Sequence, residues 1–106
     1  MAFPELVQQR MGYALYLAQI GDKHESVKPL KGFGGADVLE VVEDHAGDTY
    51  RAVYTVRFAE VVYVLHAFQK KSKRGRATPK AEIDLIKRRL QAAEADFRSH
   101  YATRQA

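Results

Sequence analysis

One continuous apolar run, Val61 to Phe68, constrains the fold of this chain more than any other stretch. Almost every residue in it is apolar, and five of the eight are Val, Tyr or Phe, a composition typical of a strand. Because a run this apolar has no solvated face, we predict a central strand of a sheet that is covered on both sides. Five cations without an intervening acid follow it directly: Lys70, Lys71, Lys73, Arg74 and Arg76. The predicted strand therefore brings concentrated positive charge to one edge of the domain.

Two further strands are predicted before this run. Thr49 to Arg57 carries Tyr, Val and Thr at the density of a strand, and Val38 to Val42 is a shorter apolar stretch. The polar residues Asp44 to Asp48 indicate a hairpin connection between these two strands. Asp22 to Lys31 is polar and contains Pro29, so we expect an exposed loop there.

Two helices are predicted to flank the strands. The first runs from about Glu5 to Ile20, because apolar residues recur at helical spacing at Val7, Met11, Ala14, Leu15 and Ala18. The second follows Thr78 and Pro79, where we expect the hydroxyl to cap the helix and the proline to begin it. Its apolar stripe consists of Ile83, Ile86, Leu90, Ala93 and Phe97.

The order helix, strand, strand, strand, helix predicts the fold class. The 106 residues give room for one domain, so we treat 1–106 as a single unit with a modest core. Short connections between strands favour a small antiparallel sheet, and an α+β domain with both helices packed on one face of that sheet. The opposite face would then be free to carry a site.

The distribution of charge favours a polyanionic partner more than the net charge of +4 does. Nine of the 17 Lys and Arg residues lie between Lys70 and Arg89, whereas Asp37 to Asp48 holds acids and no cation. The absence of cysteine excludes disulfides and thiolate metal sites. No apolar run approaches the roughly 20 residues of a membrane span, so we expect a cytoplasmic protein with no membrane contact.

The residue types of most catalytic sites are missing or scattered. The four histidines share no ligand spacing on one element, so we expect no metal and no cofactor. The glycine-rich segment Lys28 to Gly35 precedes a predicted strand rather than a helix, which favours a plain turn over a phosphate-binding loop. His66 fits a packed core histidine better than a catalytic base. The cations are therefore the principal candidates.

Arg51 is the cation that the predicted sheet holds most rigidly. Strand alternation puts Arg51 and Val53 on one face and Tyr50 and Tyr54 on the other. An arginine in the middle of a sheet is pre-organised for bidentate binding of a phosphate. A salt bridge to Glu40 on the neighbouring strand is the alternative, and composition alone favours it.

Lys70 and Lys71 follow the apolar strand directly, close to Arg51, with Phe68 available to stack on a base. A solvated charge run is the alternative interpretation for Lys73, Arg74 and Arg76. If RNA is the substrate, these residues favour a mechanism without metal. The ribose 2′-hydroxyl would attack the adjacent phosphate while Lys and Arg stabilise the developing charge.

The sequence also resembles a known family over nearly its whole length, from Phe3 to Leu90. The segments are FPELVQQRMGYALYLAQIGD, KPLKGFGGADVLEV, TYRAVYTV and VVYVLHAFQKKSKRGRATPKAEIDLIKRRL. They are similar to the HigB-like, phage-derived branch of the RelE/ParE toxin superfamily. Leu65 to Lys71, LHAFQKK, is the most specific part of the match.

That resemblance implies a compact toxin fold, a type II toxin–antitoxin partner with a helix-turn-helix, and ribosome-dependent cleavage of mRNA. By motif position, it implicates Arg51 of the YR-x-x-Y pattern and Lys70 and Lys71 of FQKK as catalytic residues. Phe68 would support them in binding nucleic acid, with Lys28 and Lys31 at the rim. The basic residues after FQKK, Lys73, Arg74 and Arg76, would add to the same nucleic-acid surface.

Two departures from the family pattern leave other functions open. Relatives carry a basic residue two positions after the motif glutamate, but Val42 stands there after Glu40, which is compatible with weakened catalysis. Relatives also have a strand before the first helix, whereas here Met1 stands almost at the start of that helix. We therefore expect an exposed sheet edge, an oligomer through that edge, or a start codon upstream of Met1. The alternatives are a gyrase-inhibiting toxin on the same fold and a remnant that only binds antitoxin or nucleic acid.

Overall fold

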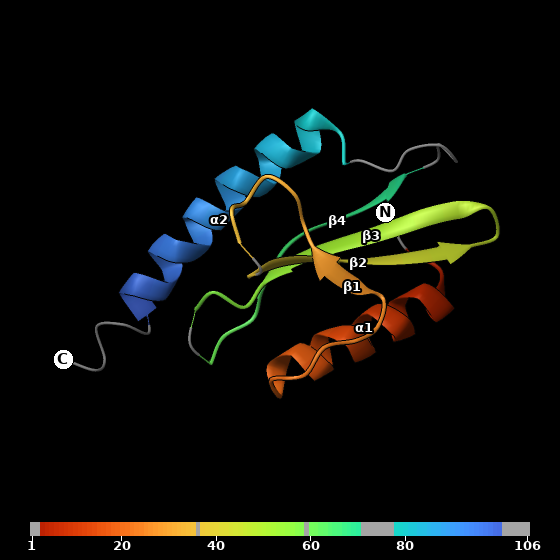
Figure 1. Cartoon of the computed structure of the whole chain (residues 1–106), viewed down its shortest axis with the longest axis horizontal. Helices are drawn as coiled ribbons and strands as arrows, with labels where there is room; N and C mark the ends of the chain where they lie inside the picture. The colour runs from red at the N-terminus through yellow and green to blue at the C-terminus, as the bar shows by residue number, and fades with distance from the viewer. Residues whose placement is uncertain (1–2, 36, 59, 71–77, 101–106) are drawn as a thin grey trace.

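The computed structural model describes residues 3–35, 37–58, 60–70 (of Lys70 the backbone alone) and 78–100. Its elements (Figure 1) are α1 (Glu5–Gln19), β1 (Val27–Pro29), β2 (Val38–His45), β3 (Asp48–Thr55), β4 (Tyr63–Lys70) and α2 (Lys80–His100). The four strands form one antiparallel sheet in the order β1-β2-β3-β4. The predicted α+β class with a small antiparallel sheet is therefore confirmed.

Helix α1 ends where the sequence places a glycine. Gly21 adopts a φ of 84°, which L-residues rarely do, and the Asp22 N–H donates to the carbonyl of Leu17 at 2.7 Å. The Gly21 N–H donates to Ala18 at 3.2 Å, completing a Schellman motif. Four of the five predicted apolar positions of this helix are buried, Val7, Met11, Ala14 and Ala18, and Leu15 is partly buried.

The β2–β3 hairpin is the centre of the sheet, and its turn is set by two residues. His45 pairs with Asp48, and the intervening Ala46 and Gly47 have φ values of 52° and 87°. Two consecutive positive φ angles give the turn whose twist matches that of antiparallel strands. The predicted hairpin is confirmed, although β2 extends three residues beyond the predicted end at Val42.

The prediction that the apolar run forms a central strand is wrong. It forms β4, which begins at Tyr63 and, among the described strands, pairs with β3 alone, so it is an edge strand, and β2 and β3 are the central strands. Val64 on β4 is 54% exposed. The apolar composition of β4 reflects packing on α2, because Leu65 and Phe68 lie in the same core cluster as Ile86.

The expected loop from Asp22 to Lys31 contains the fourth strand, β1. Val27 pairs with Val41 and is buried, and Lys28 pairs with Glu40. Pro29 does not prevent this pairing, because a residue without an N–H is tolerated on an edge strand.

The helices pack on opposite faces of the sheet, not on one face as the sequence led us to expect (Figure 1). The α1 side of the sheet carries the buried residues Leu39, Val41, Tyr50, Ala52 and Tyr54. The α2 side carries Val38, Val53, Leu65 and Phe68. Strands β2 and β3 have buried residues on both faces, and each face packs against one helix. Any site on the Arg51 face is consequently bordered by α2.

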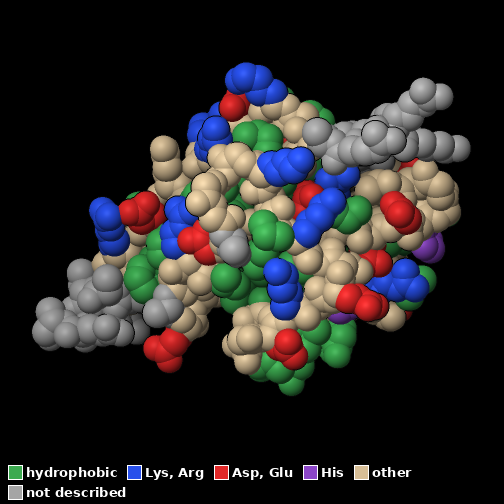
Figure 2. Space-filling model, in the orientation of Figure 1, with side chains coloured by type: hydrophobic (Ala, Val, Ile, Leu, Met, Phe, Trp, Pro, Cys, Tyr) green, Lys and Arg blue, Asp and Glu red, His purple; other side chains and the backbone are tan. Residues whose placement is uncertain are grey.

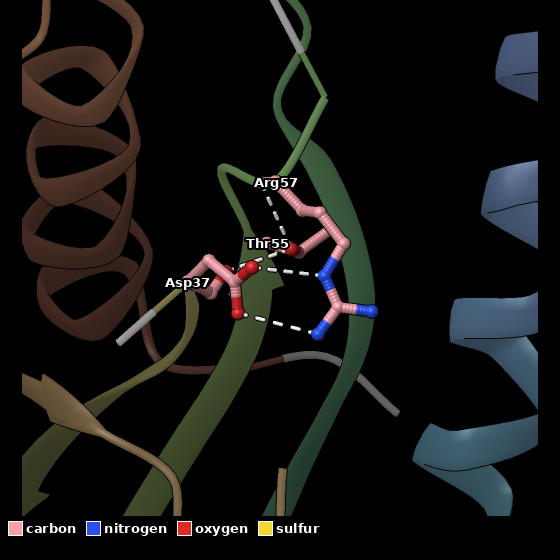
Figure 3. A network of polar contacts seen from close by, with 3 residues as sticks. All are labelled: Asp37, Thr55 and Arg57. Carbon is pink, nitrogen blue, oxygen red and sulfur yellow. Dashed lines mark hydrogen bonds and ion pairs between the residues drawn. The ribbon is translucent and has the colours of Figure 1, made fainter. Parts of the chain in front are cut away.

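A polar network closes the end of the sheet where β2 begins and β3 ends (Figure 3). Arg57 donates from Nε and Nη2 to the two carboxylate oxygens of Asp37, at 2.9 and 3.3 Å. Thr55 donates its hydroxyl hydrogen to the Asp37 carbonyl at 2.7 Å and accepts the Arg57 N–H at 3.1 Å. The Arg57 guanidinium, through its hydrogen bond and its charge, holds the pKa of Asp37 below its usual 3.8.

Candidate nucleic-acid interface

Arg51 lies near the middle of the sheet, on the face that α2 partly covers. Its Cα pairs with Val42 on β2 and with Phe68 on β4. The alternation predicted for β3 is confirmed, because Val53 packs in the α2 cluster whereas Tyr50 and Tyr54 pack in the α1 cluster. The backbone therefore fixes Arg51 as firmly as the sequence suggested.

The guanidinium of Arg51 is buried and forms a salt bridge with Glu40. Its Nη1 donates to both carboxylate oxygens of Glu40, at 3.1 and 3.3 Å, and each side chain is 5% exposed. The Nζ of Lys28 lies 3.8 Å from the same carboxylate, on a side chain that is 62% exposed. The alternative role for Arg51, a partner of Glu40, is thus present in the structure. The Glu40 carboxylate therefore pairs with one buried cation, Arg51, and with one exposed cation, Lys28.

A pocket of about 350 Å³ opens beside this group. Both rim candidates from the sequence line it, Lys28 and Lys31, together with the carboxylate-bearing Glu40 and with Pro29, Leu30, Thr78 and Ile83. We call it the β1 pocket, because β1 and the residues that follow it form one wall. The structure therefore brings Lys28 and Lys31 together around the Glu40–Arg51 pair.

Thr78 does not have the role that the sequence predicted. Its Oγ1 is buried, and within the described part of the chain this oxygen has no hydrogen-bond partner, so it caps no helix N–H there. Helix α2 begins two residues later, at Lys80, and Pro79 accepts the N–H of Ile83 at 3.0 Å. Thr78 instead lines the β1 pocket with an unused hydroxyl group.

Phe68 is 8% exposed, and its ring stacks on His66 with centroids 5.1 Å apart. The expectation of a ring available to a base is therefore not met. His66 itself is a packed residue, as predicted: its Nε2 hydrogen-bonds the Glu82 carboxylate, and its Nδ1 accepts from Arg89 at 3.0 Å. Arg89 also donates to the Leu65 carbonyl at 2.9 Å. These contacts fasten α2 to β4.

Lys70 is the last residue of β4, and its Cα pairs with Thr49. It is thus two residues beyond Phe68, the Cα partner of Arg51, which corresponds to a diagonal separation of about 7–8 Å across the strands. Four predicted site residues lie outside the described residues: Lys71, Lys73, Arg74 and Arg76. Lys and Arg side chains are spread over the face in Figure 2, with acidic side chains between them.

Two members of the pocket were not recognised as such from the sequence. Glu40 was considered only as a partner of Arg51, and Thr78 only as a helix cap. The position of Glu40 beside Lys28 follows from their Cα pairing, which exists because of the unpredicted strand β1. Among the described residues no group of three or more His, Asp or Glu side chains forms a metal site.

The chain was compared with known protein families, curated proteins and solved structures. The family model described as phage derived protein Gp49-like (DUF891) matches residues 1–91. The chain belongs to this Gp49-like family. It is a toxin-like family related to the RelE/ParE superfamily, and membership is consistent with a toxin of a toxin–antitoxin system. No curated protein and no solved structure matches the chain.

The Gp49-like match spans every strand and the first half of α2, so it includes all residues of the β1 pocket. Searched over the described ranges, neither helix is long and apolar enough to cross a membrane.

Proposed function

We propose that this Gp49-like protein is the toxin of a type II toxin–antitoxin system and cleaves ribosome-bound mRNA without a metal, as HigB-like toxins do. The main support is the convergence of Lys28 and Lys31 on a pocket that is also lined by Glu40, the salt-bridge partner of Arg51. Two exposed ammonium groups attract a polyanion, and the pocket gives part of it a defined place to bind.

In the proposed reaction, the 2′-oxygen of one ribose attacks the adjacent phosphorus. The bond from phosphorus to the 5′-oxygen of the next nucleotide breaks, the 2′-hydroxyl proton is lost, and the leaving oxygen gains a proton. Negative charge builds on the phosphoryl oxygens in the transition state. Arg51, held in one position by Glu40, together with Lys70 and Lys71, would stabilise that charge.

The test is to map RNA 5′ ends after brief induction of the wild-type chain and of variants. Arg51→Lys preserves a cation beside Glu40 and removes the guanidinium, so it separates catalysis from folding. We expect new 5′ ends with the wild type and a loss of at least tenfold with Arg51→Lys or with Lys70→Ala/Lys71→Ala. Unchanged cleavage by these variants would refute the assignments, and intact transcripts with double-strand DNA breaks would identify a gyrase inhibitor.

One observation favours a second candidate, a protein that binds its antitoxin or nucleic acid and does not cut. Val42 is the direct Cα partner of Arg51, so the basic residue expected there would stand beside the guanidinium. Its absence removes one positive charge from the centre of the site. An unchanged set of 5′ ends and intact DNA, with RNA binding retained, would identify this function.

The proposed antitoxin partner has a candidate surface on α1. Leu6, Tyr13, Tyr16 and Ile20 are 43% to 59% exposed, on the side of the helix opposite to its buried stripe. Tyr13 and Tyr16 stack on each other, with ring centroids 6.5 Å apart, and exposed apolar patches mark protein–protein contacts. We place the helix-turn-helix antitoxin on this surface, which we call the α1 stripe. It lies across the sheet from the β1 pocket.

A further inference from the structure

The β1 pocket combines hydrogen-bonding groups that match one nucleobase. A buried carboxylate, Glu40, stands 3.8 Å from an exposed ammonium, that of Lys28, so an acceptor and a donor lie side by side. We propose that the pocket binds a guanine base of the RNA. This inference rests on the proposed function, because it assigns the base next to the site of cleavage.

The walls of the pocket suit a flat ring better than a phosphate alone. Pro29, Leu30 and Ile83 supply apolar surface, and the volume of about 350 Å³ lies in the usual range for small-molecule sites, roughly 300–1,000 Å³. A phosphate would use only the two lysines and would leave this apolar surface in contact with water. A base stacks on or packs against it, as in single-stranded RNA recognition.

The Watson–Crick edge of guanine presents two donors, N1–H and N2–H, next to the acceptor O6. A carboxylate accepts at about four lone-pair positions, and Arg51 Nη1 uses one on each oxygen of Glu40. The remaining positions can accept from N1–H and N2–H while Lys28 Nζ donates to O6. Arg51 supports this role by holding the Glu40 carboxylate in one orientation.

The other bases lack this pattern. Adenine and cytosine would place a ring-nitrogen lone pair against the carboxylate, and uracil would bring two carbonyl oxygens beside its single donor. Each of these contacts sets two acceptors against each other. A good bidentate contact discriminates between bases by roughly ten- to a hundredfold in affinity.

Thr78 adds a second polar group to the lining of the pocket. Its Oγ1 is buried in the pocket wall, and no described residue bonds to it. Buried hydroxyl groups in proteins are nearly always hydrogen-bonded, because an unmet one is costly. Because this oxygen is shielded in the structure, the Thr78 side chain would have to rotate toward the pocket to bond a polar group of the base.

The test is calorimetric titration of the purified chain with the mononucleotides GMP, IMP, AMP, CMP and UMP, and with ribose 5-phosphate. We expect GMP to bind at least tenfold more tightly than AMP, CMP and UMP, and IMP, which lacks the N2 amino group, to bind more weakly than GMP. Equal binding of all six compounds would show a site for phosphate only and overturn the proposal. Absence of binding by every compound would overturn it as well.

Variants tie the binding to this pocket. Lys28→Ala should weaken the binding of GMP by about tenfold. Ile83→Trp should block the binding of GMP by filling the apolar side of the pocket. Lys80→Ala is the matched control, because its side chain is 88% exposed and pairs with Asp84 on α2. Folding is checked by circular dichroism, and since Lys28 is largely exposed its loss should leave the fold intact. An equal effect of Lys28→Ala and Lys80→Ala would contradict the assignment.

The two proposals fail in different ways. RNA cleavage with no enrichment of guanine near the cut, together with equal binding of the nucleotides, would remove the guanine site and leave the nuclease. Selective GMP binding in a protein that cuts no RNA would leave the guanine site and remove the nuclease.

Discussion

Arg51 and Glu40 form a buried salt bridge that joins the two central strands diagonally. The Cα partner of Glu40 is Val53, two residues from Arg51, yet Arg51 Nη1 reaches both carboxylate oxygens. Each side chain is 5% exposed, so water compensates little for the loss of either partner. Removing one member of such a pair leaves an uncompensated charge in the interior.

We therefore expect Arg51→Ala to lower the free energy of unfolding by about 3–5 kcal/mol. Urea denaturation at neutral pH measures this loss. The double variant Arg51→Met/Glu40→Leu is the control, since replacing both charges with apolar groups should recover most of the stability. A single variant as stable as the wild type would show that the pair contributes nothing. For this reason activity is best tested with Arg51→Lys rather than with alanine.

Local patterns in the sequence predicted the features that depend on residues close together along the chain. The stripe of α2, the buried positions of α1 and the alternation along β3 all follow from side-chain periodicity, which the backbone geometry of each element fixes. The β2–β3 turn could also be predicted from the sequence, because Gly47 lies between two strand-like stretches.

Such local patterns could not predict the position of each strand in the sheet. An apolar run such as that of β4 looks the same whether a second strand or a helix covers it, and α2 covers it here. Strand β1 is three residues long and contains Pro29, so it gives no periodic signal. The place of Glu40 in the site was missed for the same reason, because Lys28 meets Glu40 through the β1–β2 pairing.

A second prediction concerns the bidentate contact between Arg57 and Asp37 (Figure 3). Both side chains are just over a third exposed, Arg57 at 35% and Asp37 at 38%, so solvent screens their interaction. We expect Arg57→Ala to destabilise the fold by about 1 kcal/mol or less at pH 7. Urea denaturation of both proteins across a pH series measures the difference.

The sign of the pH dependence follows from the lowered pKa of Asp37. A carboxyl group that binds protons less tightly in the folded state adds stability above its unfolded pKa, near 3.8, and loses it as the pH falls through the folded value. The difference between wild type and Arg57→Ala should therefore be full above about pH 5 and shrink below 3.8. A difference that stays constant down to pH 2 would mean that Asp37 does not mediate it.

A third prediction concerns Arg89, which donates to the Leu65 carbonyl and to His66 Nδ1. These two hydrogen bonds connect α2 to the edge strand β4. We expect Arg89→Ala to cost about 1–2 kcal/mol in the free energy of unfolding. Arg88→Ala is the matched control on the adjacent exposed residue and should change stability by less than about 0.5 kcal/mol. Equal effects of the two variants would show that the contacts with β4 contribute nothing.

The last prediction concerns the α1 stripe as the docking surface of the antitoxin. The double variant Tyr16→Lys/Ile20→Lys places two charges on this surface. Tyr16 is 55% exposed and Ile20 is 59% exposed, so the fold should remain intact while the affinity for the antitoxin falls at least tenfold. Val64→Lys is the control: Val64 is 54% exposed, but on the edge strand β4. Calorimetry with the proposed antitoxin measures the effect of both changes. A loss with Val64→Lys alone would place the antitoxin on the sheet edge. A wild-type homodimer that the α1 variant dissociates would instead make the stripe a contact between two copies.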